Sequence, residues 1–367
     1  MNSTPTATPN ELERSVLNTL QGATYEEVAG QFGISRGKVY EIALKFGARK
    51  NELRIQARHA ERKRLQKEFL EAAMNATTKA DVLDFMDGLP DGCAQLVLTS
   101  PPFNIGRQYG GPGSDNFRLA YYIGWLMQCA SEMARVLAEG GVLFLQLGAT
   151  RGPDGMYPID CLMFSHLQSM GLTFQDRIVW TIPHGLTPKR RLAGRHETCL
   201  VFSKGAPSVF NATPARQPQK NPRKRGYRGA SKGQLTGHPF GAHPTNVWDI
   251  PNAGHNRRDG VEGHPAQMPA ELARRAIQLY TLPRQLVVDP FSGSGTTHAE
   301  CIRTGRGFAG ADLAYEDLRA RRLANVAPDL VSTLPGITDE SLAVWQAEAV
   351  PVRVVFDDID RQVSLPI

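Results

Sequence analysis

The 367-residue chain has no apolar run long enough to cross a membrane. Its first residues lack both the basic start and the apolar centre of a secretory signal peptide. Its five cysteines are scattered, and no two form a C-x-x-C pair that would indicate a disulfide framework or a zinc site. These absences predict a reduced, cytoplasmic protein with no membrane association.

Acidic side chains are absent from residues 204–245, which are rich in proline and glycine and poor in aliphatic residues. Such a segment cannot bury a core of its own. Although the formal net charge of the chain is only +6, the basic excess is concentrated here, and it includes Arg223, Lys224, Arg225 and Arg228. Positive charge with interleaved aromatic residues is typical of a segment that is ordered by nucleic acid. A flexible surface insertion is the alternative.

Histidine is the one metal-ligating residue type that is frequent in and after this segment, at His238, His243, His255 and His264. Three of the four adjoin proline, and no cysteine or carboxylate stands at ligand spacing. We therefore predict no metal site.

Short helices are predicted near the N-terminus. Residues 1–9 are rich in Ser, Thr and Pro and predict a disordered tail, whereas residues 10–47 predict three helices, at 11–20, 25–32 and 36–46. Gly33-Ile34-Ser35 predicts a tight turn before the third helix, as in a helix-turn-helix. That arrangement would direct Arg36, Lys38 and Tyr40 to a DNA groove. A small bundle that contacts proteins is the alternative.

Residues 48–76 predict one long, strongly basic helix that links this region to the rest of the chain. The charge would either contact phosphates or form a solvated face.

Strands and helices alternate from residue 77 onward. We expect helices at 81–89, 120–137, 158–170 and 270–280, and strands at 94–99, 142–147, 173–181, 197–203, 286–288 and 307–312. This alternation predicts an α/β fold with helices flanking a mostly parallel sheet. The loop that follows the 173–181 strand is basic and includes Lys189, Arg190 and Arg191.

The strand at 94–99 ends in the break Ser100-Pro101-Pro102-Phe103. Ligands of open α/β sheets bind at the carboxyl ends of the strands. Two prolines remove N–H donors and leave carbonyl acceptors, Ser100 adds a hydroxyl, and Phe103 adds a flat apolar face. Acceptors for an amino group beside a platform for a planar ring predict a pocket for a nucleobase.

A second strand runs into the turn Asp289-Pro290-Phe291-Ser292-Gly293-Ser294-Gly295-Thr296-Thr297, which opens a helix. Glycines allow close approach of a ligand, and a helix N-terminus favours an anionic group. The turn lacks the Gly-Lys-Ser/Thr of a P-loop and the third glycine of a dinucleotide fingerprint. Asp312 ends the following strand, where a ribose diol would be held. S-adenosylmethionine fits these features, because its carboxylate would meet the helix and its ribose would meet Asp312.

With these motifs the chain resembles the S-adenosylmethionine-dependent DNA amino-methyltransferases. Ser100–Phe103 matches the catalytic [DNS]-P-P-[YFW] motif, residues 289–297 match the cofactor loop, and residues 264–269 match an H-P-x-Q-x-P segment. The catalytic motif precedes the basic insertion and the cofactor motif, which is the permuted order of the β group. The resemblance covers about residues 80–325 and implies a doubly wound, Rossmann-like methyltransferase sheet, a methyltransferase domain at 77–325 and a target-recognition role for residues 204–245.

The resemblance also implies residue roles. The base would be flipped out of duplex DNA, Ser100 and Pro101 would accept its amino hydrogens, and Phe103 would stack on it. The catalytic set is Ser100, Pro101, Pro102 and Phe103. The cofactor-binding set is Thr99, Asp289, Pro290, Phe291, Gly293, Gly295, Thr296, Thr297 and Asp312. The basic residues of the helix-turn-helix pattern, of the loop after the 173–181 strand and of the 204–245 segment give a separate, predicted DNA-binding set: Arg36, Lys38, Lys189, Arg190, Arg191, Arg223, Lys224, Arg225 and Arg228.

Ser100 at the first motif position favours methylation of N4 of cytosine, and N6 of adenine is the alternative. A helix-turn-helix regulator with a secondary methyltransferase domain is an alternative of another class. A cognate restriction endonuclease is a possible partner, and the chain would act as a monomer or homodimer. Residues 326–367 match nothing in the family pattern and form a C-terminal extension without a predicted role.

Overall fold

The computed structural model describes residues 10–20, 23–45, 59–110, 115–182, 187–190, 192–238, 240–253 and 263–328. The described residues divide into two compact units, one within 10–211 and 245–328 and the other within 212–244. The predicted tail at 1–9, the first part of the predicted linker helix and nearly all of the C-terminal extension lie outside the described residues.

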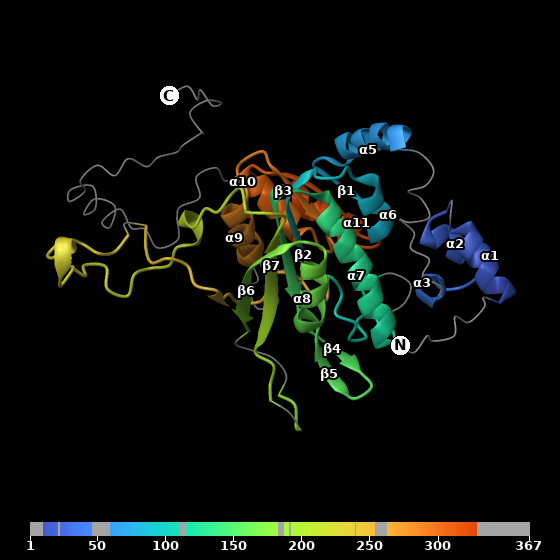
Figure 1. The fold of residues 1–367 in the computed structure, drawn as a ribbon, viewed down its shortest axis with the longest axis horizontal. Helices are drawn as coiled ribbons and strands as arrows, with labels where there is room; N and C mark the ends of the chain where they lie inside the picture. Colours follow the sequence, from blue (N-terminus) through green and yellow to red (C-terminus); the bar gives the residue numbers. More distant parts are fainter. Residues whose placement is uncertain are drawn as a thin grey trace. The chain divides into compact units, whose positions relative to one another are not determined.

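The first unit contains a mixed, mostly parallel sheet (Figure 1). Its strand order is β1-β10-β9-β2-β3-β7-β6-β8. The strands are β1 (Ala76–Thr78), β2 (Ala94–Thr99), β3 (Leu137–Leu147), β6 (Thr173–Thr181), β7 (His196–Ser203), β8 (Val247–Asp249), β9 (Leu286–Asp289) and β10 (Gly307–Ala311). Strand β7 is antiparallel to both β3 and β6, and all other pairs are parallel. The predicted α/β class is confirmed.

Helices cover both faces of this sheet (Figure 1). Helices α6 (Val82–Gly88), α7 (Leu119–Val136) and α8 (Ile159–Ser169) pack against one another in one layer. Helices α9 (Ala270–Tyr280), α10 (Thr296–Thr304) and α11 (Glu316–Ala324) form the other. Because both faces are covered, the central strand β2 is buried at all six positions, as continuous apolar runs of parallel sheets are.

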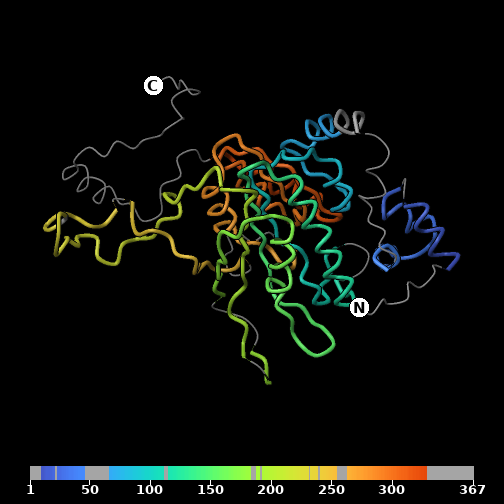
Figure 2. Tube along the Cα trace, in the orientation of Figure 1, coloured from blue at the N-terminus to red at the C-terminus, as the bar shows by residue number. Residues whose placement is uncertain are grey.

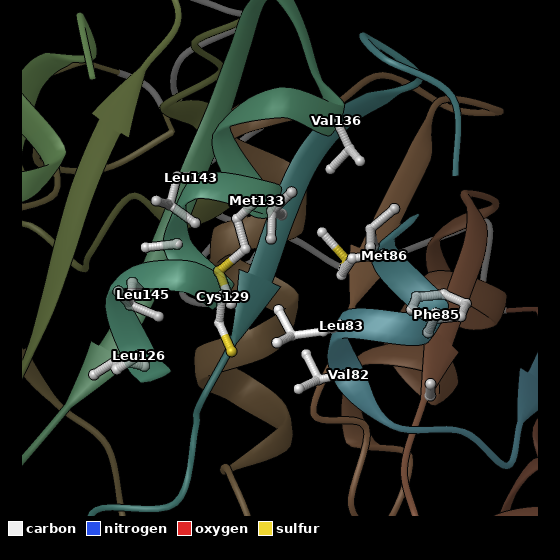
Figure 3. Packing of buried hydrophobic residues seen from close by; sticks show 14 of the residues in the cluster. Val82, Leu83, Phe85, Met86, Leu126, Cys129, Met133, Val136, Leu143 and Leu145 are labelled. Carbon is white, nitrogen blue, oxygen red and sulfur yellow. The ribbon is translucent and has the colours of Figure 1, made fainter. Parts of the chain in front are cut away.

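The core between α6, α7 and β3 is built from aliphatic, aromatic and sulfur-containing side chains that point toward one another (Figure 3). Val82, Leu83 and Met86 of α6 meet Cys129 and Met133 of α7, and each is at most 7% exposed. Asp81 begins α6 as its N-cap, because its side chain accepts a hydrogen bond from the Leu83 backbone N–H. This hydrogen bond fixes the residue at which α6 begins.

Three short helices precede this α/β region: α1 (Glu11–Thr19), α2 (Tyr25–Phe32) and α3 (Arg36–Lys45). Asn10 and Thr24 each close a capping box at a helix N-terminus. Gly33 ends α2 in the left-handed conformation at φ +62°, which a residue without a Cβ adopts at little cost. The three predicted helices are present, and α3 packs on α7.

The prediction of one helix over residues 48–76 is wrong at its C-terminal end. Within the described residues, α5 (His59–Ala73) stops at Ala73, and Ala76 already belongs to β1. The Asn75 backbone has φ +56° and its N–H donates to the Phe308 carbonyl, so the chain turns there onto the sheet edge. Pairing with β10 therefore overrides the helical pattern at this point.

Helix α11 and four strands were not predicted from the sequence. The strands are β1, β8 and the two that form a hairpin, β4 (Ala149–Gly152) and β5 (Gly155–Pro158). The hairpin follows β3 directly, and Figure 2 shows it as a green loop beyond the end of the sheet. Strand β3 also begins earlier than predicted, at Leu137, because Gly140 at φ +72° is accommodated within the strand rather than ending it.

The second unit has little regular structure in the described residues 212–238 and 240–244. It contains two 3₁₀ turns, Thr213–Ala215 and Gly229–Ser231, and isolated bridges such as Gln217 with Ala242. Arg223, Lys224, Arg225 and Arg228 are all exposed.

Candidate active site

The site lies where the direction of the sheet connections reverses. From β9 the chain continues to β10 on one side, and from β2 it continues to β3 on the other, while β9 and β2 are hydrogen-bonded neighbours. This is the switch point at which open α/β sheets bind ligands. The Thr99 hydroxyl donates a hydrogen bond of 2.6 Å to Oδ1 of Asp289 across it. The last residues of the two strands are thus tied directly to each other.

The glycine turn after β9 is held by its neighbours from several sides. Gly293 and Gly295 have φ of +48° and +79°, and Gly295 precedes α10. The Gly293 N–H donates to Oδ2 of Asp312 at 2.9 Å, and the buried Arg319 guanidinium donates to the Gly293 carbonyl at 3.0 Å. A Cβ at Gly310 would lie 2.4 Å from Oγ of Ser292. Glycine is therefore required at this position of β10. The turn is therefore preformed at a helix N-terminus.

Two carboxyl groups face this turn, and burial raises the pKa of each. The pKa of Asp289 rises to about 6, although hydrogen bonds from Thr297, Thr99 and the Phe291 backbone act in the opposite direction. The pKa of Asp312 is also raised by burial, against hydrogen bonds from the Ala314 and Gly293 backbones. A cationic ligand near Asp289 would stabilise its charged form. The α-ammonium of an amino-acid ligand has that charge, and the remaining lone pairs of Asp312 suit hydroxyl donors.

The Ser100–Phe103 segment is anchored on both sides. The Tyr122 hydroxyl donates to the Pro102 carbonyl at 2.7 Å. The side chain of Asn104 exchanges two hydrogen bonds with the Phe117 backbone, at 2.6 and 2.9 Å. Phe103 lies against Gly148 at the end of β3, where an added Cβ would come within 2.6 Å of its ring. The segment therefore has one defined conformation at the carboxyl end of β2.

Both motifs open into one cavity of about 1470 Å³. Ser100 and Gly293, nearly two hundred positions apart in sequence, both line it. The predicted site residues on its wall are Arg36, Lys38, Ser100, Pro101, Pro102, Phe103, Asp289, Pro290, Phe291, Gly293, Thr296, Thr297 and Asp312. Thr99 and Gly295, also predicted as cofactor-binding, do not line the cavity; Thr99 donates to Asp289, and Gly295 is the N-cap of α10. The cavity joins the Ser100–Phe103 segment to the glycine turn.

The predicted DNA-binding residues are distributed differently. Lys189 and Arg190 are exposed and do not line the cavity, and Arg191 lies outside the described residues. Arg223, Lys224, Arg225 and Arg228 belong to the second unit.

Tyr40 does not face a DNA groove, and that prediction is wrong. It is 7% exposed and stacks on Tyr25 with ring centroids 4.1 Å apart. Its hydroxyl donates to Asp81 at 3.3 Å, and the Arg36 guanidinium pairs with the same carboxylate at 3.1 Å. The face of α3 that carries these residues packs on the α/β region. The Tyr40 ring is buried there, and the buried Asp81 carboxylate gains a hydrogen bond and an ion pair.

The sequence also missed a pair on the cavity wall, Gln146 of β3 and Glu197 of β7. The Gln146 amide donates to Oε2 of Glu197. Burial raises the pKa of Glu197 to about 7, against this hydrogen bond and the positive charge of Arg107. The only signal in the sequence is an isolated acidic residue at the start of an apolar strand.

His264 is a third feature of the wall. Its ring lies 4.5 Å from that of Tyr315, and burial with the nearby Arg322 and Arg107 lowers its pKa to about 4. A Cβ at Gly293 would collide with the imidazole, so His264 packs closely on the glycine turn.

Within the described ranges, no cluster of three His, Cys, Asp or Glu side chains is arranged to hold a metal ion. No helix in the same ranges combines the length and apolar character needed to cross a membrane.

Comparison with known proteins agrees with this fold. The profile of the DNA methylase family matches residues 94–320, more than half of the chain. The type II methyltransferase M.BglII of Bacillus subtilis is 34% identical over 267 residues, which cover 72% of each chain. The DNA adenine methyltransferase YhdJ of Escherichia coli (strain K12) is 29% identical over 242 residues, 65% of this chain and 78% of that one.

Among solved structures, the cytosine-N4-specific PvuII DNA methyltransferase superposes with a TM-score of 0.53 at 23% identity. The match covers 74% of this chain and 93% of that one, and it shows a shared fold. The family match and the 34% identity to a type II methyltransferase identify a DNA methyltransferase. The chain belongs to the N6/N4 DNA methylase family, whose methyl donor is S-adenosylmethionine.

Proposed function

We propose that this DNA amino-methyltransferase is site-specific and transfers the methyl group to N4 of cytosine. The observation that carries the proposal is the Thr99–Asp289 hydrogen bond, because it joins the end of the base-binding strand to the start of the cofactor turn. Ser100, rather than Asp, at the first position of the catalytic motif supports cytosine over adenine.

The methyl donor fits the residues at the turn. Asp289 would hold its ammonium, the N-terminus of α10 would face its carboxylate, and Asp312 would hold its ribose. When bound, S-adenosylmethionine supplies an electrophilic methyl group. Pro290, Phe291, Thr296 and Thr297 complete this wall of the cavity.

The protein activates the acceptor by orientation. The lone pair of an exocyclic amino nitrogen is delocalised into the ring, which makes the nitrogen a poor nucleophile. The Ser100 hydroxyl and the Pro101 carbonyl accept its hydrogens and hold them out of the ring plane, which frees the lone pair. Phe103 stacks on the flipped base and contributes about 1–3 kcal/mol, comparable to the cost of removing the base from the duplex. Pro102 fixes the loop in the required shape.

Duplex DNA would be held by basic residues in three regions. Lys189, Arg190 and Arg191 follow β6, and Arg223, Lys224, Arg225 and Arg228 lie in the unit that would recognise the target sequence. Arg36 and Lys38 line the cavity, and they are proposed as DNA contacts at its N-terminal side. Guanidinium and ammonium groups of this kind hold phosphates in a salt-dependent manner.

Adenine N6 is the second candidate, favoured by the similarity to a relative named a DNA adenine methyltransferase. A regulatory role of the N-terminal helices through operator DNA is a further candidate from another class. Deleting residues 1–47, which removes α1 to α3 and leaves α5 and β1 in place, and measuring methylation and DNA binding separately would assign that role.

The cellular setting follows from the relatives named as type II methyltransferases. We propose a cytoplasmic enzyme, monomeric or homodimeric, whose cognate partner would be a restriction endonuclease.

The test is to methylate plasmid DNA with the purified full-length protein and map the modified positions by single-molecule sequencing. A single methylated motif with N4-methylcytosine supports the proposal. Methylation without a common sequence, or no methylation, contradicts it.

A further inference from the structure

Three neighbouring strands bring Ser100, Gln146 and Glu197 into one row. In the β2–β3 pair Thr99 is level with Leu145, so the next residues along, Ser100 and Gln146, are level at the carboxyl end. In the β3–β7 pair Gln146 is level with Cys199, which places Glu197 two residues away and on the same face. The Gln146 amide donates to Oε2 of Glu197, so the two side chains meet on that face.

The cavity wall includes the whole row. Ser100, Gln146 and Glu197 line it together with Trp180, which is level with Glu197 in the β6–β7 pair. Trp180 is 4% exposed and its indole N–H donates to the Ile250 carbonyl at 2.7 Å, so it is a fixed wall beside the carboxyl group. Glu197 is half-buried, and Oε2 is the oxygen that accepts from Gln146. Oε1 is then the oxygen available to a bound molecule.

The row matches the edge of a base. Neighbouring strands are about 4.8 Å apart, so the backbone of β7 lies about 10 Å from that of β2. A base whose amino group is held at Ser100 extends its Watson–Crick edge along this direction. The next atom on the edge is a ring nitrogen, N3 of cytosine or N1 of adenine, and it is a hydrogen-bond acceptor. A protein group that binds this ring nitrogen has to be a hydrogen-bond donor.

We propose that Glu197 contacts the flipped base in its protonated form, with the carboxyl O–H donating to the ring nitrogen beside the amino group. Gln146 donates to the other carboxyl oxygen and orients the acid. The contact selects against thymine and guanine, because both carry a hydrogen on the corresponding ring nitrogen and would oppose one donor with another. The proton stays on Glu197, and no bond is formed or broken.

The surroundings of Glu197 keep a substantial fraction of its carboxyl group protonated at pH 7. Arg107 and Tyr109 approach from the segment after β2, and Cys199 lies on β7 itself. Arg107 and Gln146 favour the charged form, but burial outweighs them and raises the pKa of Glu197 to about 7. The Arg107 guanidinium is partly engaged, since it donates to the Pro265 carbonyl at 2.6 Å.

The first experiment measures initial methylation rates on plasmid DNA between pH 6 and 9 for the wild type, Glu197→Gln and Glu197→Ala. The wild-type rate should fall about tenfold per pH unit above the pKa of Glu197. Gln keeps a neutral donor, so E197Q should retain the rate within a few-fold and lose this fall. At pH 6, where Glu197 of the wild type is protonated, E197A should be slower than the wild type by at least about tenfold, and its rate should lack the fall at higher pH. Glu68→Gln, an exposed position on α5, is the matched control and should follow the wild type.

A fall that persists unchanged in E197Q would overturn the proposal, and so would an E197Q protein that binds S-adenosylmethionine normally but is as slow as E197A. A second measurement does not depend on how the variants fold. The wild type is given a duplex carrying the mapped site with 3-deazacytosine, or 1-deazaadenine, at the target position. It should methylate this base at least about tenfold more slowly than the normal base. Equal rates would overturn the proposal.

The inference rests on the proposed placement of the base at Ser100. Ser100→Ala, assayed on the same DNA, separates the two failures. If S100A is as active as the wild type, the placement of the base fails. If S100A is inactive while the wild type methylates the deaza base as fast as the normal base, only the role of Glu197 fails.

Discussion

The Thr99 hydroxyl and the Asp289 carboxylate meet at 2.6 Å, although 190 positions separate them in the sequence. The bond spans β2 and β9 at the switch point, so the segment after β2 and the glycine turn after β9 share one direct contact. Both residues are buried, Thr99 fully and Asp289 with 4% exposure. A substitution at either residue should therefore change the affinity for the methyl donor while the overall fold is kept.

Thr99→Val removes this hydrogen bond and keeps the shape of the side chain. Hydrogen bonds to charged groups contribute about 1.5–3 kcal/mol, so the Kd for S-adenosylmethionine should rise about tenfold or more. Isothermal titration calorimetry measures it, with the exposed Thr173→Val on β6 as the control. An unchanged Kd for T99V would show that the bond has no part in the cofactor site.

Asp289→Asn should stabilise the protein without ligand and prevent it from binding the methyl donor. Burial raises the pKa of Asp289 to about 6, above its ordinary value of about 4. The folded protein thus holds this proton more tightly than the unfolded chain. The free energy of unfolding should fall by about 2–3 kcal/mol as the pH rises from about 4 to 6, and it should stay lower above that.

Asn is neutral throughout, so D289N should lose this pH dependence and have a higher Tm than the wild type at pH 7.5. Differential scanning fluorimetry between pH 4 and 8, with and without S-adenosylmethionine, measures both effects. A lower Tm for D289N without ligand, or a ligand-induced rise equal to that of the wild type, would contradict the prediction.

Gly148→Ala should displace Phe103 and slow methyl transfer. The added Cβ would lie 2.6 Å from the Phe103 ring, which has to move. Misplacing a positioning group by about 1 Å can cost up to a hundredfold in rate, whereas the Kd for the methyl donor should not change. Gly30→Ala on α2 is the control, because nothing lies within 4 Å of its added Cβ. Single-turnover rates on plasmid DNA distinguish the two variants, and a G148A rate equal to that of G30A would contradict the expected displacement.

Tyr40→Phe should weaken the docking of the N-terminal helices. The variant keeps the stacking on Tyr25 and loses the hydrogen bond to Asp81, which should cost about 1 kcal/mol of unfolding free energy. Urea denaturation measures it. Tyr227→Phe in the second unit is the matched control, since that ring is 85% exposed. Equal stability of the two variants would indicate that α3 is not held by this contact.

Replacing Arg223, Lys224, Arg225 and Arg228 with Gln should weaken DNA binding in a salt-dependent way. Each lost phosphate contact lowers the slope of log K against log salt by about 0.9. Fluorescence anisotropy from 50 to 300 mM salt measures the slope, with the exposed Lys67→Gln of α5 as the control. A slope that stays at the wild-type value would remove these residues from the DNA interface.

The sequence was informative wherever local chemistry decides the structure. Strand β2 and helices α2 and α9 have the predicted bounds, because buried apolar runs, capping residues and proline boundaries act over a few residues. The same holds for the glycine turn, where residue type dictates the backbone conformation.

Long-range pairing decided the features that were missed. Ala76 joins β1 because β10 lies beside it, and no local pattern indicates that partner. Tyr40 is buried by Tyr25 and by Asp81 of α6, which a helix-turn-helix pattern cannot reveal. Glu197 meets Gln146 only through the β3–β7 register. Each case depends on a tertiary contact between segments far apart in the chain.

The most direct test of the central claim is nucleoside mass spectrometry of plasmid DNA treated with the wild type and with Ser100→Ala, after calorimetry has verified that both bind S-adenosylmethionine. The account predicts N4-methylcytosine from the wild type and a loss of at least about a hundredfold in its formation by S100A. N4-methylcytosine formed at the same rate by both proteins would contradict it.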